Sequence, residues 1–249
     1  MLSQREKKIY AHSLPDQPLE QWEPLHRHLH EVAQLAGDFA AQFGFRAIAH
    51  LAGLLHDLGK MSSEFQAYIR SERSRGGDHS SPGAVLVRGH ALYPSELKNL
   101  LAAVIAAHHA GLANGTDFKK RMEAATGCMP KDWQGMIGPL PELRELKPTA
   151  KGSIAPNAAM GFADHFRIRM IFSCLVDADF LCTEAFYSRA EGKNIDREVA
   201  IPLQTLRDNL HTHMTKIAQN AKVSPVNLLR AEVLAGAKEK ATEPPGLFT

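Results

Sequence analysis

The sequence predicts an all-α protein, and two observations support this prediction. Apolar residues recur at helical spacing along most of the 249 residues, whereas no segment shows the strict alternation of a half-buried strand. Capping residues, proline and glycine stand where such helices would begin and end. With 44% hydrophobic and 22% charged residues, the composition is globular and excludes a collagen-like, disulfide-rich or extensively disordered protein.

Three helices are expected in the first 70 residues. One covers 25–43, and a second runs from 46 to 58, where Gly59 favours termination. A short third helix over 63–69 opens with Ser63-x-x-Gln66, which resembles a capping box. The apolar face of the first helix consists of Leu25, Val32, Leu35, Ala36, Phe39 and Phe43.

Five more helices are expected downstream. Ser81-Pro82 places a capping serine before a helix-starting proline, which predicts a helix over 81–92. The others are expected over 95–109, 160–189, 197–221 and 225–239. Residues 110–158 are rich in glycine and proline and predict a long, partly helical excursion, which is unusual in a compact domain unless it serves function.

Charge and cysteine usage limit the class of protein. The net charge of +2 is too small to indicate a nucleic-acid partner by itself. No apolar run reaches the ~18 residues that a membrane span needs, and the charged N-terminus is not a secretory signal. The three cysteines form no CxxC pair, which favours a reducing compartment. We therefore expect a cytoplasmic protein without a membrane span.

Histidine is the unusual residue, with 13 copies. Helical phase turns His28 and His108 toward the apolar faces of their predicted helices. A single inward histidine is more often a core residue than a ligand, so neither is strong support for a metal site. Their weight rises because other histidines and carboxylates accompany them.

The dipeptide His56-Asp57 lies in the last helical turn before Gly59, where both side chains can reach one point. Imidazole nitrogen and carboxylate oxygen suit divalent transition metals, and one carboxylate can bridge two ions. The alternative is that His56 and Asp57 simply end a helix and bind no metal. Lys60 would then only interact with the negative C-terminal end of the helix dipole.

Further candidate ligands follow. His79 precedes a predicted helix, and His108 and His109 end another. Asp177 and Asp179 lie in an otherwise apolar helix, where a carboxylate is costly unless it is paired or metal-bound. The two side chains diverge, so one ligand is expected, and helical phase favours Asp179 only slightly over Asp177.

The order of these residues is that of the HD phosphohydrolase superfamily, and the surrounding motifs are more specific. They resemble the HD nuclease domain of the type I CRISPR-associated helicase–nuclease over about residues 9 to 190, and again in the last seven residues. The motifs are Tyr10-Ala-His-Ser13, Gly53-Leu-Leu-His-Asp-Leu-Gly-Lys60, Phe65-Gln66, His79-Ser80, His108-His109-Ala-Gly-Leu112 and Leu175-Val-Asp-Ala-Asp-Phe-Leu-Cys-Thr-Glu184.

The resemblance implies an HD-domain helical bundle with a metal site in its core, and a metal-dependent nuclease acting on single-stranded DNA. Asp57 would bridge two ions, and Lys60 would lie beside the scissile phosphate. The resemblance assigns one ion to His28, His56, Asp57 and Asp179, and the other to Asp57, His79, His108 and His109. Histidine-rich ligation favours Mn²⁺, Ni²⁺, Co²⁺ or Fe²⁺ over Mg²⁺.

The same resemblance implies a domain organisation and partners in antiviral defence. The HD nuclease domain would cover 1–242, including the excursion over 110–158, and 243–249 would begin a linker to a C-terminal helicase domain. Neither a GxxxxGKS/T motif nor a DExD/H box is present, so the helicase is expected outside these 249 residues. A guide-RNA surveillance complex would supply the opened DNA.

Two other functions use the same residues. A phosphohydrolase of nucleotides or cyclic nucleotides would need a closed pocket around one base and sugar, and the excursion could wall such a pocket or flank an open groove. A non-catalytic docking module is the third possibility, although the complete set of candidate ligands argues against it. The residues leave open the native metal, the number of ions and the choice between endonuclease and exonuclease.

Overall fold

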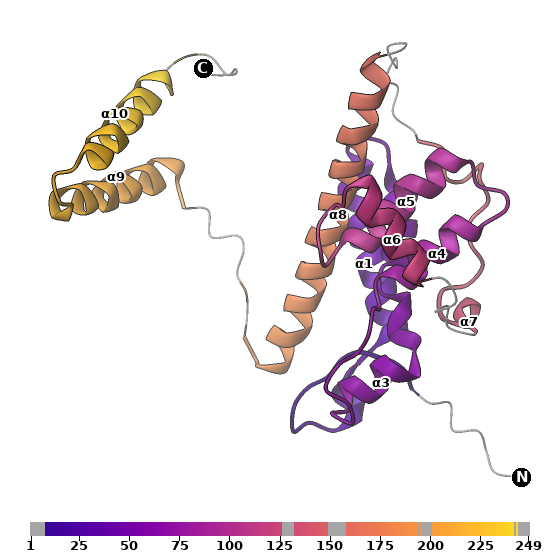
Figure 1. Cartoon of the computed structure of the whole chain (residues 1–249). Helices are drawn as coiled ribbons and strands as arrows, with labels where there is room; N and C mark the ends of the chain where they lie inside the picture. Colours follow the sequence, from indigo (N-terminus) through magenta and orange to yellow (C-terminus); the bar gives the residue numbers. More distant parts are fainter. Residues whose placement is uncertain are drawn as a thin grey trace, which may run out of the picture. The chain divides into compact units, whose positions relative to one another are not determined.

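A computed structural model describes residues 8–125, 132–148, 158–193, 195, 201–241 and 243, with only the backbone described for 158–164. The chain divides into two compact units, Met1–Asn194 and Ile195–Thr249 (Figure 1). Within the described residues the structure is helical apart from one two-stranded sheet, which confirms the all-α prediction.

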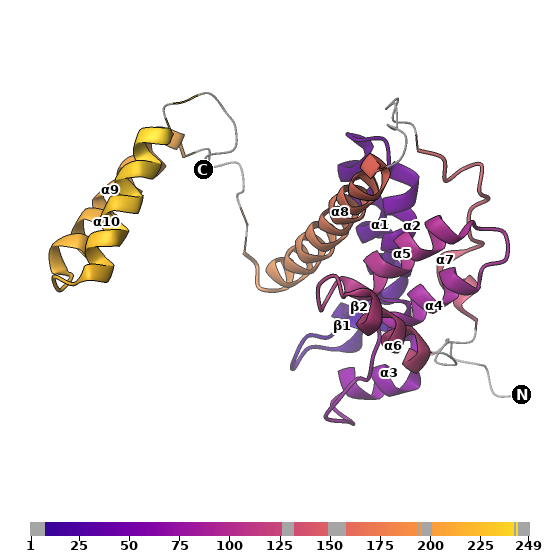
Figure 2. The same ribbon diagram turned by 45° about the horizontal axis from the view of Figure 1, so that its top comes forward.

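The first unit is a helical bundle. Its α-helices are α1 (Leu25–Ala41), α2 (Arg46–Leu55), α3 (Ser63–Ile69), α4 (Ser81–Gly89), α5 (Ser95–Ala107), α6 (Gly115–Ala125), α7 (Trp133–Ile137) and α8 (Ala158–Ala190). Two short 3₁₀ helices, η1 (Leu19–Gln21) and η2 (Leu58–Met61), and two strands, β1 (Tyr10–His12) and β2 (Glu23–Pro24), complete it. The long helix α8 runs beside α1 (Figure 2).

Helices α1, α2, α5 and α8 enclose the core, whose leucines and isoleucines are fully buried. They include Leu25, Leu29, Leu51, Leu55, Leu101, Ile105, Ile171 and Leu175. Burying each such side chain contributes about 1.5–3 kcal/mol. The apolar faces expected from helical spacing are therefore the faces that build the bundle.

Two glycines permit the helices to approach closely around the end of α2. A Cβ on Gly53 would lie 2.5 Å from Cα of Ala33 in α1, and a Cβ on Gly83 would lie 2.0 Å from the carbonyl oxygen of Leu55. Leu55 directly precedes His56-Asp57, so Gly83 allows α4 to pack closely against the segment that carries these two candidate ligands.

Replacing Gly83 with alanine is expected to destabilise the protein, because a backbone oxygen cannot move aside as a flexible side chain does. Overpacking of this kind costs about 1–3 kcal/mol, which lowers the melting temperature by roughly 2–12 °C at this chain length. Gly89→Ala is the matched control on the same helix, since nothing lies within 4 Å of a Cβ there. Thermal melts followed by circular dichroism would contradict this account if both variants melted like the wild type.

Several predicted helix boundaries are wrong by one to three residues. The helix expected to reach 58 ends at Leu55, because the backbone turns at Asp57 (φ −111°, ψ 19°) before η2 begins. Ser62, not Ser63, caps α3, and its Oγ accepts from the Phe65 N–H. Gln66 is buried and joins Tyr10 to Lys60. Its side chain accepts a hydrogen bond from the Tyr10 N–H and donates to the backbone carbonyls of Tyr10 and Lys60. Ser80, not Ser81, occupies the N-cap of α4.

The small antiparallel sheet is absent from the predictions. It pairs Tyr10 with Pro24 and His12 with Glu23, and the Leu25 N–H donates to the Ile9 carbonyl beside it. Strands of two or three residues are too short to show an alternating pattern, so periodicity could not reveal them. The sheet brings His12 and Glu23 together at the start of α1.

The excursion over 110–158 contains α6 and α7, and its residues 126–131 and 149–157 lie outside the described residues. The second unit contains α9 (Leu203–Asn220) and α10 (Pro225–Lys240), and Ser224 caps α10 by accepting from the Asn227 N–H. The expected domain over 1–242 stays a prediction, as does the linker from 243, of which 244–249 lie outside the described part. No described helix combines the length and apolarity needed to cross a membrane.

Candidate metal centre

Asp57 lies at the centre of the predicted ligands, fully buried in the turn between α2 and η2. Its Oδ2 is 3.4 Å from His56 Nε2 and 3.7 Å from His28 Nε2. Its Oδ1 is 3.3 Å from His108 Nε2. The two carboxylate oxygens therefore face different histidines, which is the arrangement of a carboxylate that can bridge two ions.

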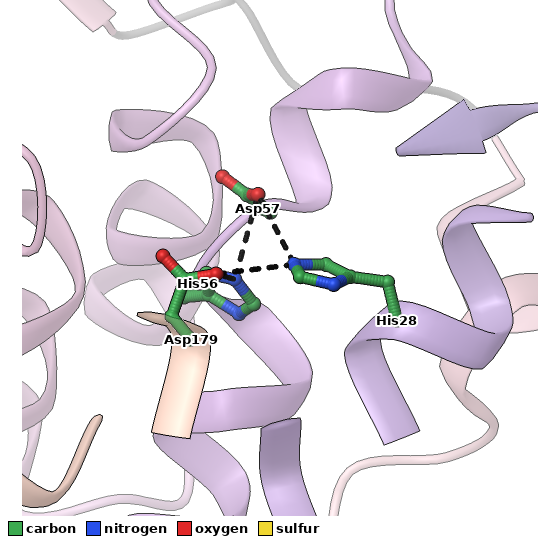
Figure 3. Close-up of side chains that lie close together, drawn as sticks. All are labelled: His28, His56, Asp57 and Asp179. Atoms are coloured by element: carbon green, nitrogen blue, oxygen red, sulfur yellow. Dashed lines mark ion pairs between the residues drawn. The ribbon is translucent and has the colours of Figure 1, made fainter. Parts of the chain in front are cut away.

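The first cluster consists of His28, His56, Asp57 and Asp179 (Figure 3). Asp179 Oδ1 is 3.3 Å from His28 Nε2 and 3.6 Å from His56 Nε2. The four side chains come from α1, the end of α2, the following turn and α8. The structure thus brings Asp179 to the centre, whereas Asp177 is exposed on α8.

The second cluster consists of Asp57, His79, His108 and His109. Both His79 Nε2 and His109 Nε2 are 3.8 Å from Asp57 Oδ1. The His79 side chain is 24% exposed and that of His109 is 46% exposed, in contrast to the fully buried His28 and His56. The second cluster is therefore the side of the centre that a substrate in solution can reach.

Backbone carbonyls fix the tautomers of two buried histidines. His56 Nδ1 lies 2.7 Å from the Gly53 carbonyl oxygen, and His108 Nδ1 lies 2.7 Å from that of Ile105. A carbonyl accepts only, so each Nδ1 carries a proton, and Nε2 is the nitrogen that faces Asp57 and could bind metal once it is deprotonated. Nε2 of His28 and of His56 are buried without a hydrogen-bond partner. Such converging nitrogens and carboxylates fit a divalent metal ion.

The pKa values of the histidines in the first cluster also fit a bound cation. Burial disfavours the charged form of His28, but the nearby carboxylates of Asp179, Asp57 and Glu23 outweigh it and raise the pKa to about 10. Burial likewise opposes the charge of His56, yet Asp57 and Asp179 raise its pKa to about 9. Protons on these imidazoles balance the carboxylates, and a bound cation would take the place of those protons.

Lys60 contributes a positive charge to the same place. Its side chain is buried, and Nζ lies 2.6 Å from Asp57 Oδ2. Burial disfavours the ionised form of Asp57, but Lys60, His56 and the nearby imidazoles of His108 and His109 outweigh it and hold the pKa well below its usual range. Asp57 is therefore a charged ligand at neutral pH. The position of Lys60 beside a scissile phosphate stays a prediction.

The loop that carries His79 is held on two sides. The Gly59 N–H donates to the His79 carbonyl, and a Cβ on Gly59 would lie 2.4 Å from that oxygen. Arg121 Nη2 lies 2.5 Å from Ser80 Oγ, and its Nε lies 2.9 Å from Ser81 Oγ. Arg121, the last residue of the basic run 119–121, thus supports the loop that carries His79.

Sequence reasoning missed Glu23. It is 2% exposed and lies between His12 and His28. No sequence signal could have selected it, because its burial depends on a strand pairing too short to predict. His12, in contrast, belongs to a motif of the resemblance; it contacts Glu23 and the ring of His28 but is a member of neither cluster.

These features define a helical protein with a buried, carboxylate-centred site for divalent metal. Residues 25–147 match the family described as the HD domain, a span that includes every predicted ligand except Asp177 and Asp179. This match supports the HD superfamily, and an HD domain with a buried His/Asp cluster suggests a metal-dependent phosphohydrolase. No curated protein matches the chain.

Proposed function

We propose that the chain is a metal-dependent nuclease that hydrolyses phosphodiester bonds of single-stranded DNA, as the degradation module of a type I CRISPR helicase–nuclease. The observation that carries the hydrolytic chemistry is the placement of Asp57, whose two oxygens face separate groups of histidines. The choice of DNA rests on motifs outside the shared ligands, such as His108-His109-Ala-Gly-Leu112, which resemble those nucleases.

A phosphodiester is negatively charged, and the proposed site would supply positive charge to it. Divalent ions would orient and activate a water molecule and neutralise the attacked and leaving oxygens. His28, His56, Asp57 and Asp179 would hold one ion, and Asp57, His79, His108 and His109 the other. Lys60, which already balances Asp57, would offset negative charge that develops on the phosphate.

The donor set also favours particular metals. Five imidazoles and two carboxylates supply the two clusters, and imidazole nitrogen suits transition metals. Mg²⁺ prefers oxygen ligands and retains its waters. We therefore expect Mn²⁺, Ni²⁺, Co²⁺ or Fe²⁺ to support the reaction better than Mg²⁺.

Within this proposal the chain is cytoplasmic and works with partners. A guide-RNA surveillance complex exposes the DNA, and a C-terminal helicase domain of the full-length protein feeds the strand to the exposed side of the second cluster. A site of this kind contacts the phosphates and not the bases, so little preference for DNA sequence is expected.

The proposal predicts metal-dependent cutting of circular single-stranded DNA. The purified chain would be incubated with the circle in EDTA, Mg²⁺, Mn²⁺ or Ni²⁺, beside a linear strand and a panel of nucleotides and cyclic nucleotides. Cutting of the circle with Mn²⁺ or Ni²⁺, abolished by EDTA, supports an endonuclease, because a circle has no end for an exonuclease. Hydrolysis of a nucleotide with both DNAs intact would replace the proposal with the nucleotide phosphohydrolase.

A further inference from the structure

We infer that Glu23 is a positioning residue that orients His28 toward the metal, with His12 holding Glu23 in place. The inference rests on the metal centre of the proposed function but concerns two residues outside the predicted ligand set. It also gives the small β1–β2 sheet a role, since that sheet pairs His12 with Glu23.

Glu23 lies behind His28 as seen from the metal centre. Its Oε2 is 2.7 Å from His12 Nδ1 and 3.4 Å from His28 Nδ1. The opposite nitrogen of the same ring, His28 Nε2, is 3.3 Å from Asp179 Oδ1. The Nδ1 edge of the His28 ring thus lies toward the Glu23 carboxylate, and the Nε2 edge lies toward the first cluster.

Two unsatisfied atoms occur side by side here. Glu23 Oε1 and His28 Nδ1 are both buried without a hydrogen-bond partner. An unpaired buried polar atom costs about 1–3 kcal/mol, and more when it is charged. Glu23 Oε2, 3.4 Å from His28 Nδ1, would satisfy that nitrogen if the distance shortened by a few tenths of an ångström. Such hydrogen bonds are often long without the bound partner and shorten when it arrives.

Comparison with the other buried ligands supports this role. His56 and His108 each have a backbone carbonyl 2.7 Å from Nδ1, which leaves Nε2 free for metal. For His28, Glu23 Oε2 is the acceptor placed at Nδ1. A carboxylate there fixes the tautomer, orients the ring and increases the basicity of Nε2.

Two other interpretations fit the geometry less well. Ligand atoms of His12, Glu23 and His28 are close enough to suggest a separate ion, but the 2.7 Å between His12 Nδ1 and Glu23 Oε2 is the distance of a direct hydrogen bond, which satisfies both atoms without a cation. Alternatively, the His12–Glu23 pair could serve only to join β1 to β2. That role would affect folding without affecting the affinity for metal.

The test measures metal binding directly. Co²⁺ affinity would be determined by competition with a chromophoric chelator, together with the visible spectrum of bound Co²⁺ and the melting temperature of the metal-free protein. Glu23→Gln is the test variant, because it keeps the size and removes the charge. Glu31→Gln is the matched control, since Glu31 is a partly exposed acid on α1 that pairs with Arg27.

Glu23→Gln is expected to weaken Co²⁺ affinity by about 10–100-fold and to alter the spectrum, whereas Glu31→Gln matches the wild type. If Glu23→Gln does not fold, Glu23→Asp replaces it; this variant keeps the charge but withdraws it from His28, and weaker Co²⁺ binding is again expected. Wild-type affinity and spectrum in a folded Glu23 variant would overturn the inference while leaving the metal centre intact. A wild-type chain that binds no Co²⁺ would overturn both the inference and the proposed function.

Discussion

Replacing Asp57 with asparagine is expected to abolish hydrolysis and to remove the bound metal. Each Asp57 oxygen faces a different histidine group, with His56 Nε2 at 3.4 Å and His108 Nε2 at 3.3 Å. An amide offers one neutral oxygen in place of two charged ones, so it cannot serve both clusters. Metal ions contribute several kcal/mol to transition states of this kind, and their loss corresponds to a decrease of ~10³-fold or more in kcat.

The measurement needs a control for folding, because Asp57→Asn also leaves Lys60 buried without its partner. Removing one member of a buried ion pair costs about 3–5 kcal/mol. The double variant Asp57→Asn/Lys60→Met removes both charges and is expected to regain thermal stability without regaining metal or activity. Metal analysis and DNA cleavage would be compared for wild type, single and double variants. Wild-type turnover in metal-loaded, folded Asp57→Asn would exclude a bridging role for Asp57.

Much of the centre follows from local sequence order. His56 and Asp57 are adjacent, His108 and His109 are adjacent, and each pair ends a helix whose apolar face is plain in the sequence. Packing those faces into one bundle brings the helix ends together. These helix ends, together with the resemblance, were therefore enough to predict which residues come together, whereas the metal class stays a prediction.

The remainder depends on contacts between segments distant in the sequence. Asp177 and Asp179 both lie among apolar residues of one helix, so periodicity favoured Asp179 only slightly. The packing of α8 against α1 brings Asp179 to His28. Glu23 acquires its burial from a pairing with His12 that has no periodic signal. Arg121 is basic within a basic run, and only the nearby Ser80 hydroxyl shows that it supports the His79 loop.

Asp179→Asn is expected to remove metal from the first cluster and to reduce hydrolysis by ~10²–10³-fold, as the loss of several kcal/mol of transition-state stabilisation requires. Burial disfavours the charged form of Asp179, but the nearby imidazoles of His28 and His56 outweigh it and hold the pKa well below its usual range. The substitution thus removes a full negative charge 3.3 Å from His28 Nε2. The second cluster keeps all its side chains, so residual metal is expected there.

Asp177→Asn is the matched control, since it makes the same chemical change two residues away on an exposed face of the same helix. It is expected to keep wild-type metal content and turnover, because its carboxylate does not reach the centre. Metal analysis and cleavage rates of both variants, measured in one preparation series, separate the two aspartates directly. Equal losses in both variants would indicate that negative charge on α8, and not ligation by Asp179, supports the site. A loss confined to Asp177→Asn would require a different rotation of α8 against α1.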